Sequence, residues 1–110
     1  MEMKKLLEFV ERVSKQLAKG NPGSTQTERV FARMVKLTEE VGELADEVLA
    51  SQGDQRKEKL EGKNEESLGN EVADVLITTL LLAASLNVDV PKALVKKIAK
   101  IEARLPESIL

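Results

Sequence analysis

The stretch KLTEEVGELADEV, residues 36–48, decides the predicted fold. Its apolar side chains recur at steps of three and four, which is the period of an amphipathic α-helix in a helical bundle. The stretch also contains five acids, of which Glu39, Glu40 and Glu43 crowd one turn. Like charges at this spacing cost about 0.2–0.5 kcal/mol per pair, so the helix needs a compensating partner.

Four helices are expected in the chain. They are predicted at residues 2–19, from 24 or 25 to about 50, from 67 or 70 to 86, and from 89–91 to about 105. Thr25 and Glu28 fit a capping box at the start of the second helix. Residues 51–69, which are charged and contain glycine, are expected to form a mobile connection. The sequence therefore predicts an all-α four-helix bundle in a single domain over residues 1–110.

The expected third helix repeats the acidic spacing at Glu71 and Asp74, in a segment that is otherwise apolar. Thr78 and Ser85 lie within about 60° of these acids on a helical wheel, so one polar stripe follows a helix that otherwise looks buried. An ionised carboxylate in such a place costs several kcal/mol unless it has a partner. A helical module that only docks on the surface of a partner would not need a buried polar stripe, so the stripe favours a site inside the protein.

Two acidic pairs on neighbouring helices predict a site for a divalent cation. Glu40 and Glu43 share one face of the second helix, and Glu71 and Asp74 share a face of the third. Mg²⁺ and Mn²⁺ prefer carboxylate oxygens and leave positions open for the phosphates of a substrate. Two alternatives remain open, namely a plain solvated acidic face and the preference of a first helical turn for negative charge.

Composition excludes several kinds of site. The chain has no cysteine and no histidine, so disulfides and thiolate or imidazole metal sites are excluded. A net charge of −2 without a basic block argues against a nucleic-acid polymer as partner. No targeting segment is visible, and the apolar stretch 72–86 is too short to span a bilayer, so we expect a cytoplasmic protein without a membrane partner. The only aromatic residues, Phe9 and Phe31, are expected in the core, with a ring for the base of a nucleotide as the alternative role.

The segments EEVGEL (39–44) and EVADVL (71–76) together resemble the EExxE…ExxD signature of MazG-like, all-α nucleoside triphosphate pyrophosphohydrolases. The resemblance extends from about Val30 to Pro106. It implies cleavage of a (deoxy)nucleoside triphosphate between the α and β phosphates, which gives a monophosphate and pyrophosphate. The site residues that it implies are four Mg²⁺ ligands, with Mn²⁺ as the alternative ion, and one residue that orients or deprotonates the attacking water. These are Glu40, Glu43, Glu71 and Asp74 as ligands, and Glu39 for the water.

Three cations are candidates for binding the substrate. Lys97 and Arg104 match cationic positions of the family, although Ile101 replaces the Asn that family members often carry between them. They either hold phosphates as fixed positive charges or belong to a solvated basic face. Lys36, one turn before Glu40, either reaches a phosphate or forms an i,i+4 ion pair with that acid.

The leading hypothesis is a nucleotide-pool enzyme with a dCTP-like preference, the latter by analogy alone. One alternative is the same chemistry on a nucleotide-like metabolite such as phosphoribosyl-ATP. Another is a non-enzymatic helical interaction module whose acidic strip binds a basic partner. Because the third helix is apolar nearly all round and the family is typically oligomeric, we also expect a homodimer or homotetramer with active sites near the subunit interfaces.

Overall fold

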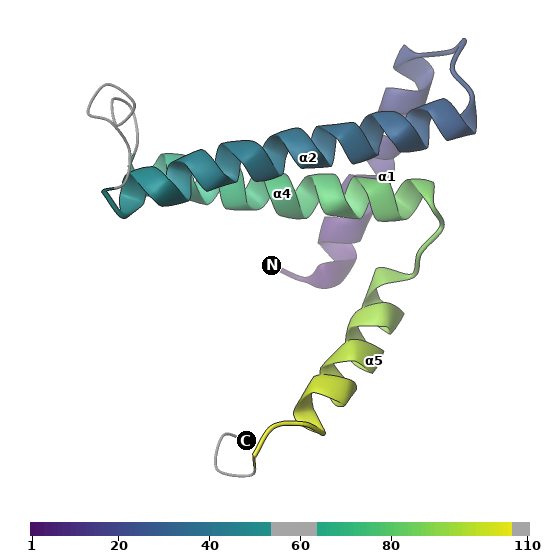
Figure 1. The fold of residues 1–110 in the computed structure, drawn as a ribbon. Helices are drawn as coiled ribbons and strands as arrows, with labels where there is room; N and C mark the ends of the chain where they lie inside the picture. The colour runs from purple at the N-terminus through teal and green to yellow at the C-terminus, as the bar shows by residue number, and fades with distance from the viewer. Residues whose placement is uncertain (54–63, 107–110) are drawn as a thin grey trace.

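The computed structural model of the protein describes residues 1–53 and 64–106, which contain four helices (Figure 1). These are α1 (Met3–Gly20), α2 (Gln26–Ser51), α4 (Glu65–Ser85) and α5 (Val90–Glu102). The described ranges contain no strand. The prediction of an all-α chain with four helices is confirmed.

Local side-chain caps explain where α2 and α5 begin. The Glu28 amide donates to Thr25 Oγ1 at 3.1 Å, and the Thr25 amide donates to Glu28 Oε1 at 2.9 Å. This is the predicted capping box, and it holds the pKa of Glu28 below its ordinary value through the hydrogen bond from the Thr25 backbone. At α5, the Lys92 amide donates to Asp89 Oδ1 at 3.1 Å, and a proline occupies the first turn.

The start of α4 differs from the prediction. The Ser67 amide donates to Asn64 Oδ1 at 2.9 Å, and the Asn64 amide donates to Ser67 Oγ at 2.7 Å. This second capping box starts the helix at Glu65, and acids in the first turn favour that start. The prediction of a connection through residue 69 was therefore wrong for residues 65–69, while residues 54–63 lie outside the described residues.

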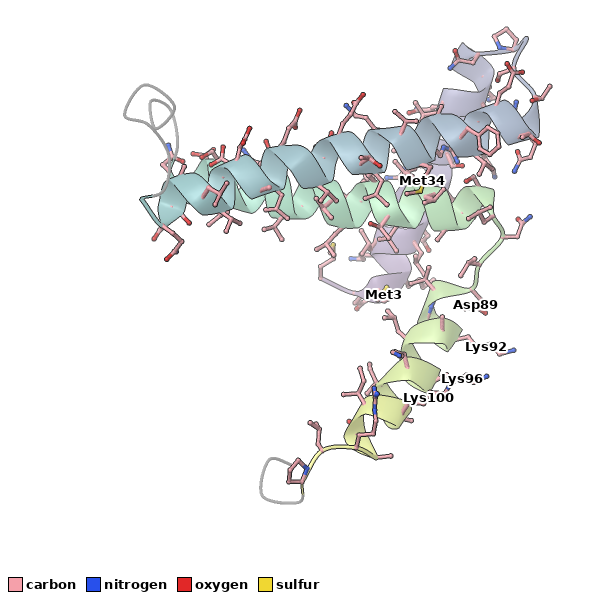
Figure 2. All side chains as sticks on the ribbon, in the orientation of Figure 1. Met3, Met34, Asp89, Lys92, Lys96 and Lys100 are labelled. Carbon is pink, nitrogen blue, oxygen red and sulfur yellow. The ribbon has the colours of Figure 1, made fainter. Side chains whose placement is uncertain are left out.

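Helices α2 and α4 lie side by side and antiparallel, as Figure 1 shows, and α1 packs across α4. Three hydrogen bonds fix the register of the pair: Gln26 Nε2 to the Ser85 carbonyl (2.6 Å), Arg33 Nη1 to the Leu81 carbonyl (3.2 Å), and Ser67 Oγ to Glu47 Oε2 (2.9 Å). Helix α5 extends away from the other helices after the turn at residues 86–89 (Figure 1). Its lysines Lys92, Lys96 and Lys100 project from one side (Figure 2).

The buried positions between α2 and α4 are mainly polar. They form what we call the polar seam, which consists of Arg33, Glu40, Glu47, Thr78 and Ser85. On each helix these residues are seven apart, so they fall on one side. The apolar residues Met34, Val41 and Val48, expected to form the contact seam, are each about half exposed. That expectation was wrong in part for one chain. Val30, Leu37 and Leu44, which were expected in the same seam, are half-buried, whereas the other three stay open.

The chain buries little apolar surface by itself. Among the described residues only Val10 and Ala50 are buried hydrophobic side chains. Leu76 is 60% exposed, and Phe31, which was expected in the core, is 64% exposed. The surface of the chain is 8492 Å², whereas a compact monomer of its mass exposes roughly 6,000 Å². The radius of gyration of 17.3 Å also exceeds the value of about 13 Å typical of a compact domain of similar length.

By length and hydropathy alone, α4 would pass as a helix able to cross a membrane. The central helices of soluble proteins meet the same criterion. Glu71 and Asp74 lie near the middle of α4, where charges are costly in lipid. We therefore take this helix as only a weak indication of a membrane protein.

Candidate metal centre

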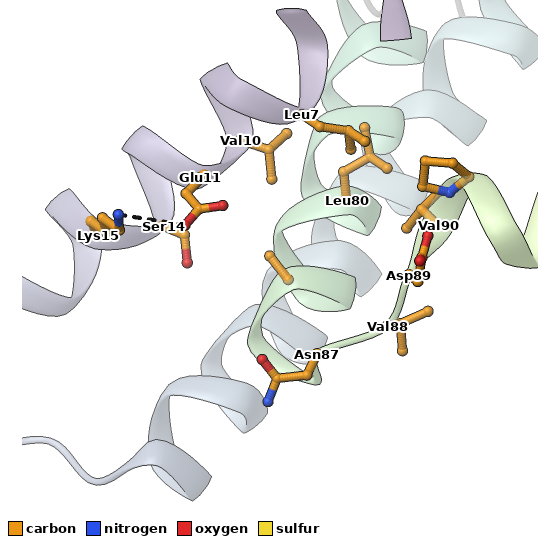
Figure 3. A pocket seen from close by; sticks show the side chains of 12 residues that line it. Leu7, Val10, Glu11, Ser14, Lys15, Leu80, Asn87, Val88, Asp89 and Val90 are labelled. Carbon is orange, nitrogen blue, oxygen red and sulfur yellow. Dashed lines mark ion pairs between the residues drawn. The ribbon is translucent and has the colours of Figure 1, made fainter. Parts of the chain in front are cut away.

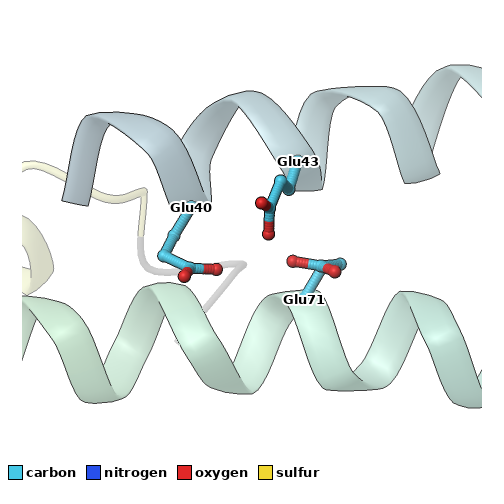
Figure 4. A group of neighbouring side chains, drawn as sticks. All are labelled: Glu40, Glu43 and Glu71. Atoms are coloured by element: carbon cyan, nitrogen blue, oxygen red, sulfur yellow. The ribbon is translucent and has the colours of Figure 1, made fainter. Parts of the chain in front are cut away.

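Three of the four predicted ligands converge between α2 and α4. Glu40 and Glu43 come from α2 and Glu71 comes from α4, and Figure 4 shows their carboxylates gathered between the two helices. One oxygen of each side chain lies within 4.8 Å of the others. The spacing of three residues on α2 and the antiparallel register with α4 produce this arrangement.

The fourth predicted ligand, Asp74, lies outside this group of three. Its side chain is exposed on α4, three residues after Glu71. The negative charge of Asp74 nevertheless acts on the cluster, and it is one cause of the raised pKa of Glu71. The structure thus brings Glu40, Glu43 and Glu71 together and leaves Asp74 at the border.

The three acids differ in their exposure. Glu40 belongs to the polar seam and is buried, Glu71 is half-buried, and Glu43 is exposed. The cluster therefore runs from the helix interface to the surface, where a solute can reach it. An ion held by the buried carboxylates would still have a side open to a substrate.

The charges of the cluster are not balanced. Burial raises the pKa of Glu71 above its ordinary value, and the negative charges of Glu43, Asp74 and Glu40 raise it further, in that order. Each of these causes disfavours the ionised carboxylate of Glu71. A cation at the cluster would reverse that effect by attracting all of the negative charges.

The residues present fit a divalent cation that prefers oxygen ligands. Oε2 of Glu40 and Oε2 of Glu71 are buried and have no hydrogen-bond partner among the described residues. A buried acceptor without a donor costs free energy, and a bound cation removes that cost. Two such oxygens within one acidic cluster are therefore a specific indication of a metal site.

Lys36 and Glu39 lie beside the cluster on the exposed side of α2. Lys36 Nζ is 3.2 Å from Glu40 Oε1 and 3.6 Å from Glu39 Oε2, so the i,i+4 ion pair considered from the sequence is present. The hydrogen bond with Glu40 is the main cause of the raised pKa of Lys36, which keeps this amine protonated. One lysine offsets only part of the negative charge nearby.

The other two predicted substrate cations, Lys97 and Arg104, lie far along the chain from the acids. Lys97 belongs to α5, Arg104 follows it, and both side chains are exposed. Within the described ranges no ion pair joins either of them to the acidic cluster. One chain therefore does not bring these cations to the candidate metal centre.

The role of Arg33 was not predicted from the sequence. This buried side chain lies on the polar seam seven residues before Glu40, and it donates to Ser14 on α1 and to Leu81 on α4. The regular spacing of Arg33, Glu40 and Glu47 was the available signal. It was overlooked because the apolar pattern of α2 was taken to mark the side that packs against its neighbour.

Comparison with known proteins agrees with the acidic motif. Residues 26–109 match the family model of the MazG nucleotide pyrophosphohydrolase domain. The match spans α2, α4 and α5, and so includes every acid of the cluster. No curated protein and no solved structure matches the chain. Members of the matched family are typically dependent on divalent metal ions and act on nucleoside triphosphates.

Proposed function

The chain belongs to the MazG nucleotide pyrophosphohydrolase family, and we propose that it hydrolyses a (deoxy)nucleoside triphosphate to the monophosphate and pyrophosphate with Mg²⁺. The observation that carries the proposal is the convergence of Glu40, Glu43 and Glu71, with two buried oxygens that have no donor in the part of the chain that the structure describes. Asp74, one turn along α4 from Glu71, is proposed as the fourth ligand. Mn²⁺ has the same preference for oxygen ligands and is the expected substitute.

The proposed mechanism relies on positioning and on neutralising charge. When bound, the divalent cation supplies positive charge that offsets the charge on the phosphates. Glu39 is exposed beside the cluster, and we assign it the role of orienting the attacking water and accepting its proton. A bond forms between the water oxygen and phosphorus as the bond to the bridging oxygen breaks, and pyrophosphate leaves. Lys36, already protonated at the cluster, would hold a phosphate oxygen.

We further propose that the active form is a homodimer or homotetramer. The open apolar faces of α2 and α4 suit a second pair of the same helices, which would complete a four-helix arrangement. The surface exposed in excess of a compact monomer is roughly 2,500 Å² per chain, or about 5,000 Å² for two chains, which is at the upper end of the range that obligate dimers bury. Because α5 extends away from its own acids, we assign Lys97 and Arg104 to phosphates bound at the cluster of another copy.

The composition of the chain limits how the base of the substrate can be recognised. The chain has no Trp, Tyr or His, and Phe31 is the exposed ring of α2. An aliphatic pocket with one phenyl ring discriminates modestly between bases. We propose a dCTP-like preference by analogy with the family, a role in clearing nucleotides from the pool, and a cytoplasmic location.

The test is pyrophosphate release from a panel of deoxynucleoside triphosphates and phosphoribosyl-ATP, with Mg²⁺ and with a chelator. We expect Mg²⁺-dependent release from at least one deoxynucleotide. Release from phosphoribosyl-ATP alone would move the assignment to that metabolite. No release from any compound, with the fold intact by circular dichroism, would contradict the enzymatic proposal and favour a helical interaction module.

A further inference from the structure

A second polar site lies at the other end of the polar seam from Glu47. It is a pocket of about 430 Å³ between α1, the start of α2 and the end of α4. Three of its lining side chains are cationic, namely Lys15, Arg29 and Arg33, and none of the described residues that line it is acidic. The other lining residues are mostly polar or small: Ser14, Ala18, Gln26, Ala84, Ser85 and Asn87.

Arg33 forms the buried wall of this pocket, and its positive charge has no counterion among residues 1–53 and 64–106. Its side chain is 8% exposed, and its guanidinium donates to Ser14 Oγ at 3.2 Å, to the Ser14 carbonyl at 3.3 Å and to the Leu81 carbonyl at 3.2 Å. All three acceptors are neutral, and within the described ranges no carboxylate pairs with Arg33. Burial and the nearby charge of Arg29 lower the pKa of Arg33, as expected when a charge is desolvated without compensation.

Arg29 and Lys15 place two further charges at the more exposed side of the pocket. Arg29 is held by neutral acceptors, with Nη1 at 2.6 Å from the Ser24 carbonyl and Nη2 at 3.2 Å from Gln26 Oε1. Lys15 pairs with Glu11 at 3.4 Å, as Figure 3 shows, but both side chains are about 70% exposed. Such a surface pair contributes little, so Lys15 is free to turn toward an anion.

A neighbouring pocket extends this site toward α5. It has a volume of about 460 Å³, and Figure 3 shows Leu7, Val10 and Leu80 among the side chains that line it. The two pockets share Ser14, Lys15, Ala84 and Asn87. This neighbouring pocket is mixed in character, because Glu11 and Asp89 line it beside the aliphatic side chains.

We propose that the pocket formed by Lys15, Arg29 and Arg33 binds a phosphate dianion, either free phosphate or the phosphate of a phosphomonoester. Guanidinium groups match the spacing of phosphate oxygens, and the hydroxyl of Ser14 and the amide of Asn87 line the same space. Arg33 precedes Glu40 by seven residues, about 10 Å along the helix, so this anion site is separate from the acidic cluster. The proposal does not depend on the proposed function.

The opposite explanation is that Arg33 only links three helices through hydrogen bonds. In that case substitution would lower stability, but nothing in the protein would respond to phosphate. A carboxylate from a second copy of the chain could also fill the pocket, and phosphate would then not bind. Both explanations predict the absence of phosphate binding, whereas the proposal predicts saturable binding that Arg29 and Lys15 strengthen.

The experiment is calorimetric titration of the metal-free full chain with inorganic phosphate at constant ionic strength. We expect saturable binding that weakens about tenfold or more in Arg29→Gln, weakens in Lys15→Gln, and is unchanged in the control Lys96→Gln on α5. Neither Arg29 nor Lys15 is buried, so these variants are expected to fold, which circular dichroism checks. Glu43→Gln should retain phosphate binding even if it loses all activity.

A second titration with a nucleoside monophosphate distinguishes the two sources of the phosphate group. Tighter binding than that of inorganic phosphate assigns the site to a phosphomonoester, and equal binding assigns it to free phosphate. The proposal is overturned if no saturable binding occurs, if Arg29→Gln and Lys15→Gln both bind phosphate as the wild type does, or if Glu43→Gln abolishes the binding.

Discussion

Replacing Glu43 with glutamine is expected to reduce pyrophosphate release by at least about a hundredfold. Loss of a residue that merely supports a metal ligand costs 10–100-fold in affinity or activity, so loss of a ligand should cost at least the upper value. The substitution keeps the size of the side chain and removes one charge of the three acids that converge. Steady-state pyrophosphate release at saturating Mg²⁺ measures the effect.

The matched control is Asp46→Asn. Asp46 is an exposed acid of the same helix, three residues beyond Glu43 and outside the group of three. The substitution Asp46→Asn changes the charge by the same amount as Glu43→Gln. It therefore separates a loss of activity that is specific to Glu43 from a general effect of removing one negative charge. We expect near-normal activity for Asp46→Asn. Equal losses in the two variants, or no loss in either, would be incompatible with a metal centre at Glu43.

Replacing Leu76 with glutamine is expected to lower the free energy of unfolding by about 2 kcal/mol or more. In the isolated chain Leu76 is 60% exposed, and a substitution at such a position usually changes stability by less than about 0.5 kcal/mol. If a second copy covers the apolar face of α4, the same change removes a buried leucine side chain, which contributes about 1.5–3 kcal/mol, and introduces a polar group. Denaturant unfolding followed by circular dichroism measures the difference.

Two further observations accompany this prediction. The unfolding midpoint of the wild type should rise with protein concentration, because association stabilises only the folded state. Lys92→Gln, at an exposed polar position of α5, should change stability by no more than about 0.5 kcal/mol. A particle of 12.1 kDa by light scattering, together with a harmless Leu76→Gln, would show that the apolar faces stay open in solution.

The helix boundaries were largely predictable because local chemistry sets them. The capping box of Thr25 and Glu28 and the cap at Asp89 involve residues three apart in sequence. The box was expected, and the fourth helix was expected to start at 89–91. The missed start of α4 has the same local cause. Asn64 and Ser67 form a capping box with an unusual pair of residues, and it was overlooked inside a charged segment.

The acidic cluster was predictable in part. Glu40 and Glu43 share a face through their spacing alone, but their distance from Glu71 depends on the register between α2 and α4. The polar stripe of α4 correctly indicated which side of this helix is buried, since Thr78 and Ser85 are both buried. Asp74 lies one turn from Glu71, and its side chain is exposed although Thr78 and Ser85 of the same stripe are buried.

The packing of α2 was not predictable from its own pattern. An apolar periodicity shows which side of a helix avoids water. It does not show whether a helix of the same chain or a second copy of the chain covers that side. Met34, Val41 and Val48 belong to the apolar pattern and are each about half exposed, whereas Arg33, Glu40 and Glu47 of the same helix are buried. The physical reason is that hydrogen bonds such as Ser67 to Glu47 and Arg33 to Leu81 select the polar contact.

The most direct measurement is the thermal unfolding of wild type and Glu71→Gln, each with and without Mg²⁺. Without a metal, burial and three neighbouring negative charges oppose the ionised Glu71, so Glu71→Gln should unfold at a higher temperature than the wild type. With Mg²⁺, the wild type should gain stability and the variant should gain little. The account would be contradicted if Mg²⁺ raised the unfolding temperature of both proteins equally, or of neither.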